Sequence, residues 1–77
     1  MACKVIYEKV SKDSEEYFFK TTFRRFYSGE IEPYTKKIEK ATFDKNYKIK
    51  RKNTDFRFHD YESTNPFIKR LVDKGEN

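Results

Sequence analysis

Few residues in this chain can bend the backbone sharply or carry covalent chemistry. Among its 77 residues there are two glycines, two prolines, one cysteine and one histidine, and tryptophan is absent. So few glycines leave no glycine-rich loop of the kind that cradles phosphate groups. A single cysteine, Cys3, excludes an intramolecular disulfide and a metal site built from several cysteines. The sequence therefore predicts a fold without covalent cross-links, with no metal site and no cofactor.

Long apolar segments are also missing. No stretch approaches the roughly 18 apolar residues that span a bilayer, and residues 1–8 lack the apolar core of a signal peptide. One unpaired cysteine is typical of a reducing compartment. We therefore expect a cytoplasmic protein with no membrane partner.

Aromatic and charged side chains dominate what remains. The chain contains eight Phe and six Tyr, and 40% of its residues are charged. Each buried ring removes a large area from water, so a few rings can hold together a chain that is too short for a large core. Disordered chains are poor in aromatic residues. The composition predicts one small, basic, folded domain over residues 1–77.

The net charge of +5 is concentrated in one segment. Residues 45–57 hold a group of basic side chains against one acidic residue, Asp55, while basic and acidic residues balance elsewhere. The basic residues of this segment are Lys45, Lys48, Lys50, Arg51, Lys52 and Arg57. Such a local excess of cations is typical of a surface that meets an anionic partner.

Two alternating segments predict an N-terminal antiparallel hairpin. Residues 3–10 are rich in β-branched and aromatic types, and residues 17–27 alternate strongly. Alternation in the second segment places Tyr17 and Phe19 on one face, which we expect to face the core. Residues 11–14 between the segments predict a turn. The other face of the second strand carries Phe18, Lys20, Arg24 and Phe26.

The middle of the chain can be read in two ways. Pro33 suits the first position of a helix, and apolar residues recur after it at helical spacing. Acidic residues precede basic ones here, as the helix dipole favours. These features predict a helix over residues 33–43, and the alternative is a third strand over residues 36–43.

A second hairpin is predicted further along the chain. Residues 47–52 and 55–61 each alternate, and the two residues between them allow a tight turn. One face of this hairpin would gather a positive stripe across two adjacent strands. The residues of that stripe are Lys48, Lys50, Lys52, Arg57 and His59.

The chain ends in a predicted helix over residues 66–74. Asn65 can cap it, Pro66 suits its first position, and Gly75 stands where helices commonly end. The resulting order is β-β-α-β-β-α. It predicts an α+β fold, in which helices pack on one face of a four-stranded antiparallel sheet.

The basic and aromatic sheet face favours a binding protein over an enzyme, with RNA or single-stranded DNA as its partner. Cations would contact phosphates and exposed rings, among them Phe18, Phe26 and Tyr61, would stack on bases. The alternative is that the lysines form only a solvated face that protects the sheet from edge pairing, with Phe18 and Phe26 beneath the helices. The candidate site residues are Lys48, Lys50, Lys52, Arg57, His59, Arg24, Lys20 and Tyr61. No RNA-recognition, cold-shock or helix-turn-helix signature accompanies them.

Two alternatives stay open. The same cations could dock on an acidic protein surface, as in a phage- or mobile-element-type inhibitor of a host enzyme. A small basic ribonuclease-like toxin that uses His59 is the second alternative. A nucleophilic pair of Cys3 with His59 is conceivable, but a packed thiol is the more common role of such a cysteine. We expect no catalytic residues.

Overall fold

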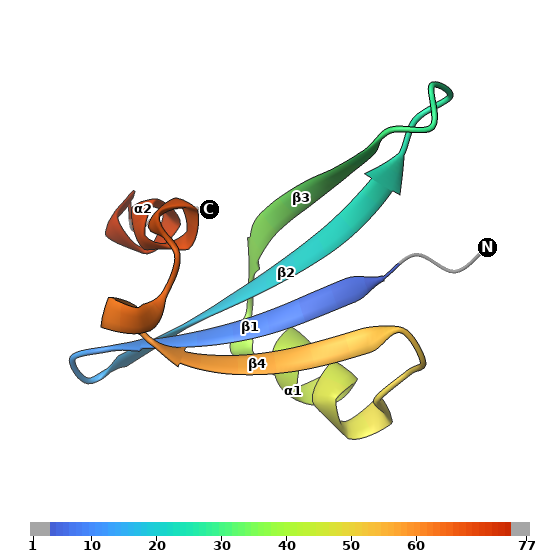
Figure 1. The fold of residues 1–77 in the computed structure, drawn as a ribbon. Helices are drawn as coiled ribbons and strands as arrows, with labels where there is room; N and C mark the ends of the chain where they lie inside the picture. The colour runs from blue at the N-terminus through green and yellow to red at the C-terminus, as the bar shows by residue number, and fades with distance from the viewer. Residues whose placement is uncertain (1–3, 75–77) are drawn as a thin grey trace.

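The computed structural model describes residues 4–74, which form a sheet with a helix on each side (Figure 1). The strands are β1 (Val5–Lys12), β2 (Glu15–Arg25), β3 (Ile31–Ile38) and β4 (Thr54–Asp60). The helices are α1 (Lys40–Ile49), the short 3-10 helix η1 (Tyr61–Ser63) and α2 (Pro66–Lys74). The predicted α+β class is confirmed, but the predicted order of elements is not.

The four strands form a mixed sheet in the order β3-β2-β1-β4. The β1–β2 and β2–β3 pairs are antiparallel, whereas β4 pairs with β1 in the parallel direction. The prediction of a purely antiparallel sheet is therefore wrong for one strand pair. The reason is that α1 carries the chain from one edge of the sheet to the other, so β4 arrives in the same direction as β1.

The first hairpin agrees with the sequence prediction. β1 and β2 are antiparallel, and Lys12 pairs with Glu15 across a turn of two residues. Asp13 in that turn has a φ of 55°, a conformation that Asp adopts more easily than most residues. Cys3, which the prediction placed at the start of the first strand, lies outside the described residues.

The middle of the chain contains a third strand, as in the second prediction, but with different bounds. Residues 31–38 form a strand, and the helix begins only at Lys40. Pro33 lies opposite Phe23 in an edge strand, where a proline is tolerated because one side of the strand needs no hydrogen bonds. Pairing of this segment with β2 therefore outweighs the helical spacing of its apolar residues.

Residues 47–52 do not form the predicted strand. They contain the last turn of α1 and the loop that follows it. The alternating lysines favoured a strand, but Phe43 and Tyr47 form a helical pair. They are four residues apart, and their rings stack with centroids 6.4 Å apart. The predicted second hairpin is therefore wrong, and only its second strand exists, as β4.

The helices cover opposite faces of the sheet, not one face as predicted (Figure 1). α1 packs through Phe43 on Tyr7 and Phe18, whereas α2 packs on Val10 and Phe19. Neighbouring residues of a strand point to opposite faces, so Phe18 and Phe19 each belong to a different core. Both are buried. Phe18 therefore lies beneath α1, as the alternative interpretation expected, and does not offer a surface ring.

The C-terminal helix forms as predicted, and its N-terminus is capped by Asn65. The amide of Ile68 donates to Asn65 Oδ1 at 2.9 Å. Ile68 and Val72 then bury the apolar stripe of α2 against β1 and β2. Helices this short depend on such packing for their stability.

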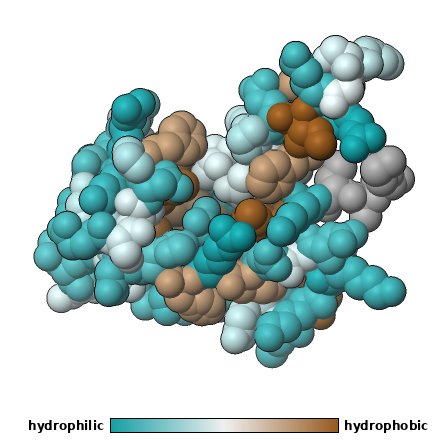
Figure 2. All heavy atoms as spheres, in the orientation of Figure 1, coloured by the Kyte–Doolittle hydropathy of each residue, from teal (hydrophilic) through white to brown (hydrophobic). Residues whose placement is uncertain are grey.

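The β2–β3 hairpin extends beyond the rest of the sheet. The pairing of β1 begins at Val5, opposite Thr22, so residues 23–33 form a two-stranded arm (Figure 1). Hydrophilic side chains cover most of the face drawn in Figure 2, with hydrophobic atoms exposed along the sheet and on the arm. Phe26, Tyr27 and Ile31 are exposed there. Within residues 4–74, no helix combines the length and the apolar character needed to cross a membrane.

Candidate nucleic-acid interface

The predicted positive stripe does not form on the sheet. Lys48 lies in the last turn of α1, Lys50 caps that helix, and Lys52 lies in the loop before β4. The stripe required these residues to alternate along a strand, and a helix followed by a loop distributes them differently. This part of the prediction is wrong in geometry, although the cations remain close together in the chain.

The basic residues around the end of α1 form a group that we call the helix-end cluster. Its members are Lys45, Lys48, Lys50, Arg51 and Lys52, and all are exposed. None of them forms an ion pair within residues 4–74. The nearest acidic residues in the sequence are already engaged. Asp44 binds Lys40 at 3.1 Å, and Asp55 binds Lys4 at 3.2 Å.

The backbone at Lys50 turns the chain out of the helix. Lys50 has a φ of 51°, in the left-handed region, and its amide donates to the carbonyl of Asn46. Its ammonium group lies 4.8 Å from the centroid of the Tyr47 ring. A cation near a helix C-terminus is favoured by the dipole, which accounts for Lys48 but not for the three basic residues that follow the helix.

Arg57 and His59 lie on the other side of the sheet from α1. Alternation along β4 places Phe56 and Phe58 against the α1 aromatic cluster, so the residues between them face the α2 side. Arg57 approaches Asp55 at 3.8 Å. His59 Nε2 lies 3.1 Å from Oε2 of the buried Glu8. These two predicted site residues are therefore separated by the sheet from α1 and bound to carboxylates.

Tyr61 is held by α2. Its hydroxyl donates to both carboxylate oxygens of Asp73, at 2.8 and 2.9 Å, and Lys12 contacts Asp73 at 3.2 Å. The hydrogen bond from Tyr61, followed by that from Lys12, lowers the pKa of Asp73, and the Asp73 hydrogen bond raises the pKa of both Tyr61 and Lys12. The Tyr61 ring therefore holds α2 in place, and it lies apart from the helix-end cluster.

Lys20 and Arg24 belong to a second basic surface, on the α1 side of the β2–β3 hairpin. We call it the ribbon face, and its residues are Lys20, Thr22, Arg24, Tyr34 and Lys36. Lys20 lies directly opposite Lys36, and the Arg24 guanidinium lies 4.1 Å from the centroid of the Tyr34 ring. Tyr34 and Lys36 were missed because the segment was read as a helix. Their two-residue spacing is the signal that could have placed them on one face of a strand.

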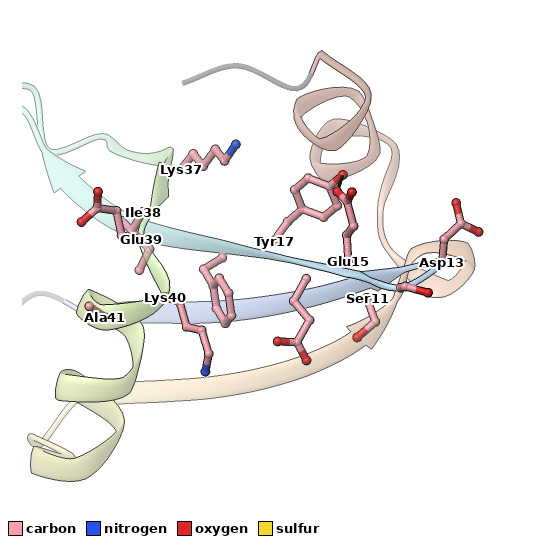
Figure 3. Close-up of a pocket in the computed structure, with 12 residues that line it drawn as sticks. Ser11, Asp13, Glu15, Tyr17, Lys37, Ile38, Glu39, Lys40 and Ala41 are labelled. Atoms are coloured by element: carbon pink, nitrogen blue, oxygen red, sulfur yellow. Dashed lines mark hydrogen bonds between the residues drawn. The ribbon is translucent and has the colours of Figure 1, made fainter.

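Several hollows open on the surface of the described residues. One of about 1130 Å³ lies between the β1–β2 turn and the start of α1, where β2 extends past the end of β3 (Figure 3). Its lining is rich in carboxylates, from Asp13, Glu15, Glu16 and Glu39. A hollow of about 490 Å³ lies between α2 and β3. Four carboxylates against Lys37 and Lys40 make the lining of the hollow of about 1130 Å³ acidic on balance, which disfavours phosphate there.

The described residues contain no cluster of His, Cys, Asp and Glu that could hold a metal ion. His59 has one carboxylate partner, Glu8. His59 lines a small hollow with Lys9, Phe58, Asp60 and their neighbours, whereas Glu8 lines the hollow between α2 and β3. The proposed pair of Cys3 with His59 involves a residue outside the described part of the chain. In comparisons with known proteins, no family model, no curated protein and no solved structure matched this chain.

Proposed function

We propose that this protein binds nucleic acid and that the helix-end cluster makes the phosphate contacts. The observation that carries the proposal is a run of exposed basic side chains, Lys45 to Lys52, without carboxylate partners in the described chain. Other basic residues of the described chain also lack ion pairs, but only here do five of them follow one another within eight residues. A cluster left without such partners is an electrostatic surface for an anion with several charges.

The scaffold supports this role because part of the cluster stands on a fixed element. Phe43 anchors α1 through contacts with Tyr7 and Phe18, so Lys45 and Lys48 project from a helix that is held against the sheet. Lys45 and Lys48 are three residues apart and share a side of the helix. A phosphate backbone that lies along this side meets cations whose positions are set before binding, which lowers the entropy cost of binding.

The partner that competes with nucleic acid in this proposal is an acidic protein surface. Both partners offer negative charge, but a nucleic acid releases condensed counterions when it binds. The salt dependence of the affinity therefore separates them. If the five cations of the cluster each neutralise one phosphate, log Kd should change with log salt at a slope of about 3.5 for a single strand.

The test is a titration of a fluorescent single-stranded oligonucleotide at several salt concentrations. Replacement of Lys48, Lys50 and Lys52 by Gln should weaken binding and reduce the salt slope by about 2. The matched control replaces Lys69, Arg70 and Lys74 of α2 by Gln, which removes the same charge from a different part of the surface. Equal affinities in the two variants would show that net charge alone drives binding, and would overturn the assignment.

A pull-down from nuclease-treated lysate tests the competing partner. A stoichiometric protein complex that survives nuclease treatment, and that is lost in the Lys48, Lys50 and Lys52 variant, would replace nucleic acid by an acidic protein as the ligand of the cluster. Loss of every partner on nuclease treatment is the result expected from the proposal.

A further inference from the structure

The ribbon face contains two lysines held opposite each other by the sheet. Lys20 of β2 and Lys36 of β3 are direct cross-strand partners in the antiparallel pairing, so their side chains leave the sheet on the same face. Side chains in this position have β-carbons only about 5 Å apart. Like charges placed there repel each other and lower the stability of the strand pair.

No carboxylate within residues 4–74 forms an ion pair with either lysine. Of the acidic residues on this face, Glu32 lies opposite Arg24 in the register, and Glu16 of β2 pairs with Lys9 at 2.9 Å. The ammonium group of Lys20 lies 5.9 Å from the centroid of the Tyr7 ring, on the β1 side. The repulsion between the lysines is therefore left for a ligand to relieve, and an anion between them would do so.

An exposed aromatic ring lies next to these lysines. Tyr34 is two residues before Lys36 on the same face of β3, and the residue is 47% exposed. The cross-strand partner of Arg24 is Glu32, not Tyr34. The Arg24 guanidinium nevertheless lies 4.1 Å from the centroid of the Tyr34 ring. An arginine stacked on an exposed tyrosine holds the ring in place, and an aromatic ring held in this way is a stacking surface for a nucleic-acid base.

We propose that the ribbon face is a subsite for single-stranded nucleic acid, in which Lys20 and Lys36 hold a backbone phosphate and Tyr34 stacks on a neighbouring base. This inference rests on the proposed function, and it specifies the class of ligand. In a duplex the faces of internal bases are stacked on one another, so they cannot reach Tyr34. Phosphate contacts by the helix-end cluster alone would not distinguish a single strand from a duplex.

The experiment compares a fluorescent oligothymidylate with a duplex of the same length, using the full chain. Replacement of Tyr34 by Ala should weaken binding of the single strand by about tenfold and leave duplex binding unchanged. Replacement of Tyr34 by Leu, which keeps an apolar side chain on the strand, should weaken the single strand similarly. Equal affinity of the wild-type protein and both Tyr34 variants for the single strand would overturn the stacking role.

The two lysines are tested by a double replacement with Gln. It should lower the salt slope for the single strand by about 1.4 and raise the melting temperature of the free protein, because the repulsion is gone. The control replaces Lys37 of β3 and Lys69 of α2 by Gln, and it should leave the stacking subsite intact. A higher melting temperature without a change in slope would overturn the phosphate role.

The results separate this inference from the proposed function. The helix-end variant is the replacement of Lys48, Lys50 and Lys52, and the ribbon-face variants are those of Tyr34 and of Lys20 with Lys36. If the helix-end variant loses affinity while the ribbon-face variants retain it, the subsite is wrong and the proposed function stands. If the ribbon-face variants lose affinity while the helix-end variant retains it, the subsite stands and the assignment of phosphate contacts to the helix-end cluster is wrong.

Discussion

The hydroxyl of Tyr61 donates to both carboxylate oxygens of Asp73, which also binds Lys12 at 3.2 Å. The three residues come from η1, α2 and β1. Through them polar contacts hold α2 against the end of β1. These contacts add to the packing of the apolar stripe of α2.

Acid should weaken the hydrogen bonds that Tyr61 and Lys12 donate to Asp73. The pKa of Asp73 is lowered in the folded protein, from an ordinary value of 3.8, by hydrogen bonds from Tyr61 and Lys12. Its contribution to stability is present above the ordinary pKa and is lost as the pH falls through the lower, folded one. We expect Asp73→Asn to lower the melting temperature at neutral pH and to reduce the loss of stability below about pH 4. Thermal melts across the acid range measure this.

The control for this variant is Asp60→Asn. The Asp60 side chain makes no capping hydrogen bond to η1, so its replacement should leave the acid limb of the stability profile unchanged. A neutral-pH melting temperature that is the same for Asp73→Asn and wild type would contradict the role given to Asp73.

Alkaline pH should weaken the same contact by ionising Tyr61. The pKa of Tyr61 is raised above its ordinary 10.0, mainly by its hydrogen bond to Asp73. The stabilising contribution is therefore complete below pH 10 and is lost as the pH rises through the folded pKa. Tyr61→Phe should be less stable than wild type at neutral pH, and the difference should shrink at high pH. Circular dichroism melts at neutral and at high pH measure this. The same difference in melting temperature between Tyr61→Phe and wild type at both pH values would contradict it.

Phe43 is the residue on which α1 depends. Its ring contacts those of Tyr7, Phe18 and Phe56, and it is 3% exposed. Phe43→Ala should lower the free energy of unfolding by about 3–5 kcal/mol, a large part of the stability of so small a protein. Urea denaturation measures the loss. Tyr27→Ala in the exposed arm tip is the control and should cost under about 0.5 kcal/mol.

The helix cap at Lys50 offers a matched pair of variants. A φ of 51° suits glycine, which has no β-carbon. Lys50→Gly and Lys50→Ala remove the same charge, but we expect the glycine variant to be more stable by about 1 kcal/mol. Their denaturation midpoints give the difference directly. A more stable alanine variant would mean that the left-handed cap does not form.

His59 should be the partner that makes burial of Glu8 tolerable. Glu8 is 9% exposed and its carboxylate contacts His59 at 3.1 Å. His59→Ala should cost about 1–3 kcal/mol, because it leaves a buried acid without its hydrogen bond. Replacing both residues by Ala should cost less than the sum of the two single replacements. Strict additivity in that cycle would show that the two side chains are independent.

The elements that rest on local patterns were predictable, and the arrangement was not. Alternation in residues 17–27 predicted β2, and Asn65 with Pro66 predicted the start of α2. The end of α1 was missed because Lys48 alternates with Lys50 and Lys52 beyond the helix, as in a strand, while the helical signal reduces to Phe43 and Tyr47. The parallel pairing of β1 with β4 joins segments far apart in the chain, and no local pattern encodes it.

The candidate site divides in the same way. Composition located the excess of cations between residues 45 and 57, but strand alternation could not place them once the segment proved to be helix and loop. Lys20 and Arg24 were placed on one strand face as predicted. Their neighbours Lys36 and Tyr34 became visible only when β3 was known to be a strand, because a cross-strand neighbour is a property of register.

The parallel β1–β4 pairing also fixes the sequence of assembly. β1, β2 and β3 are joined by short turns and can meet early, whereas β4 must wait until the whole β3–α1 segment has been synthesised and folded across the sheet. Until then one side of β1 has no strand beside it. A nascent or truncated chain that stops before residue 54 would therefore expose the central strand, and it is this form that we expect to self-associate.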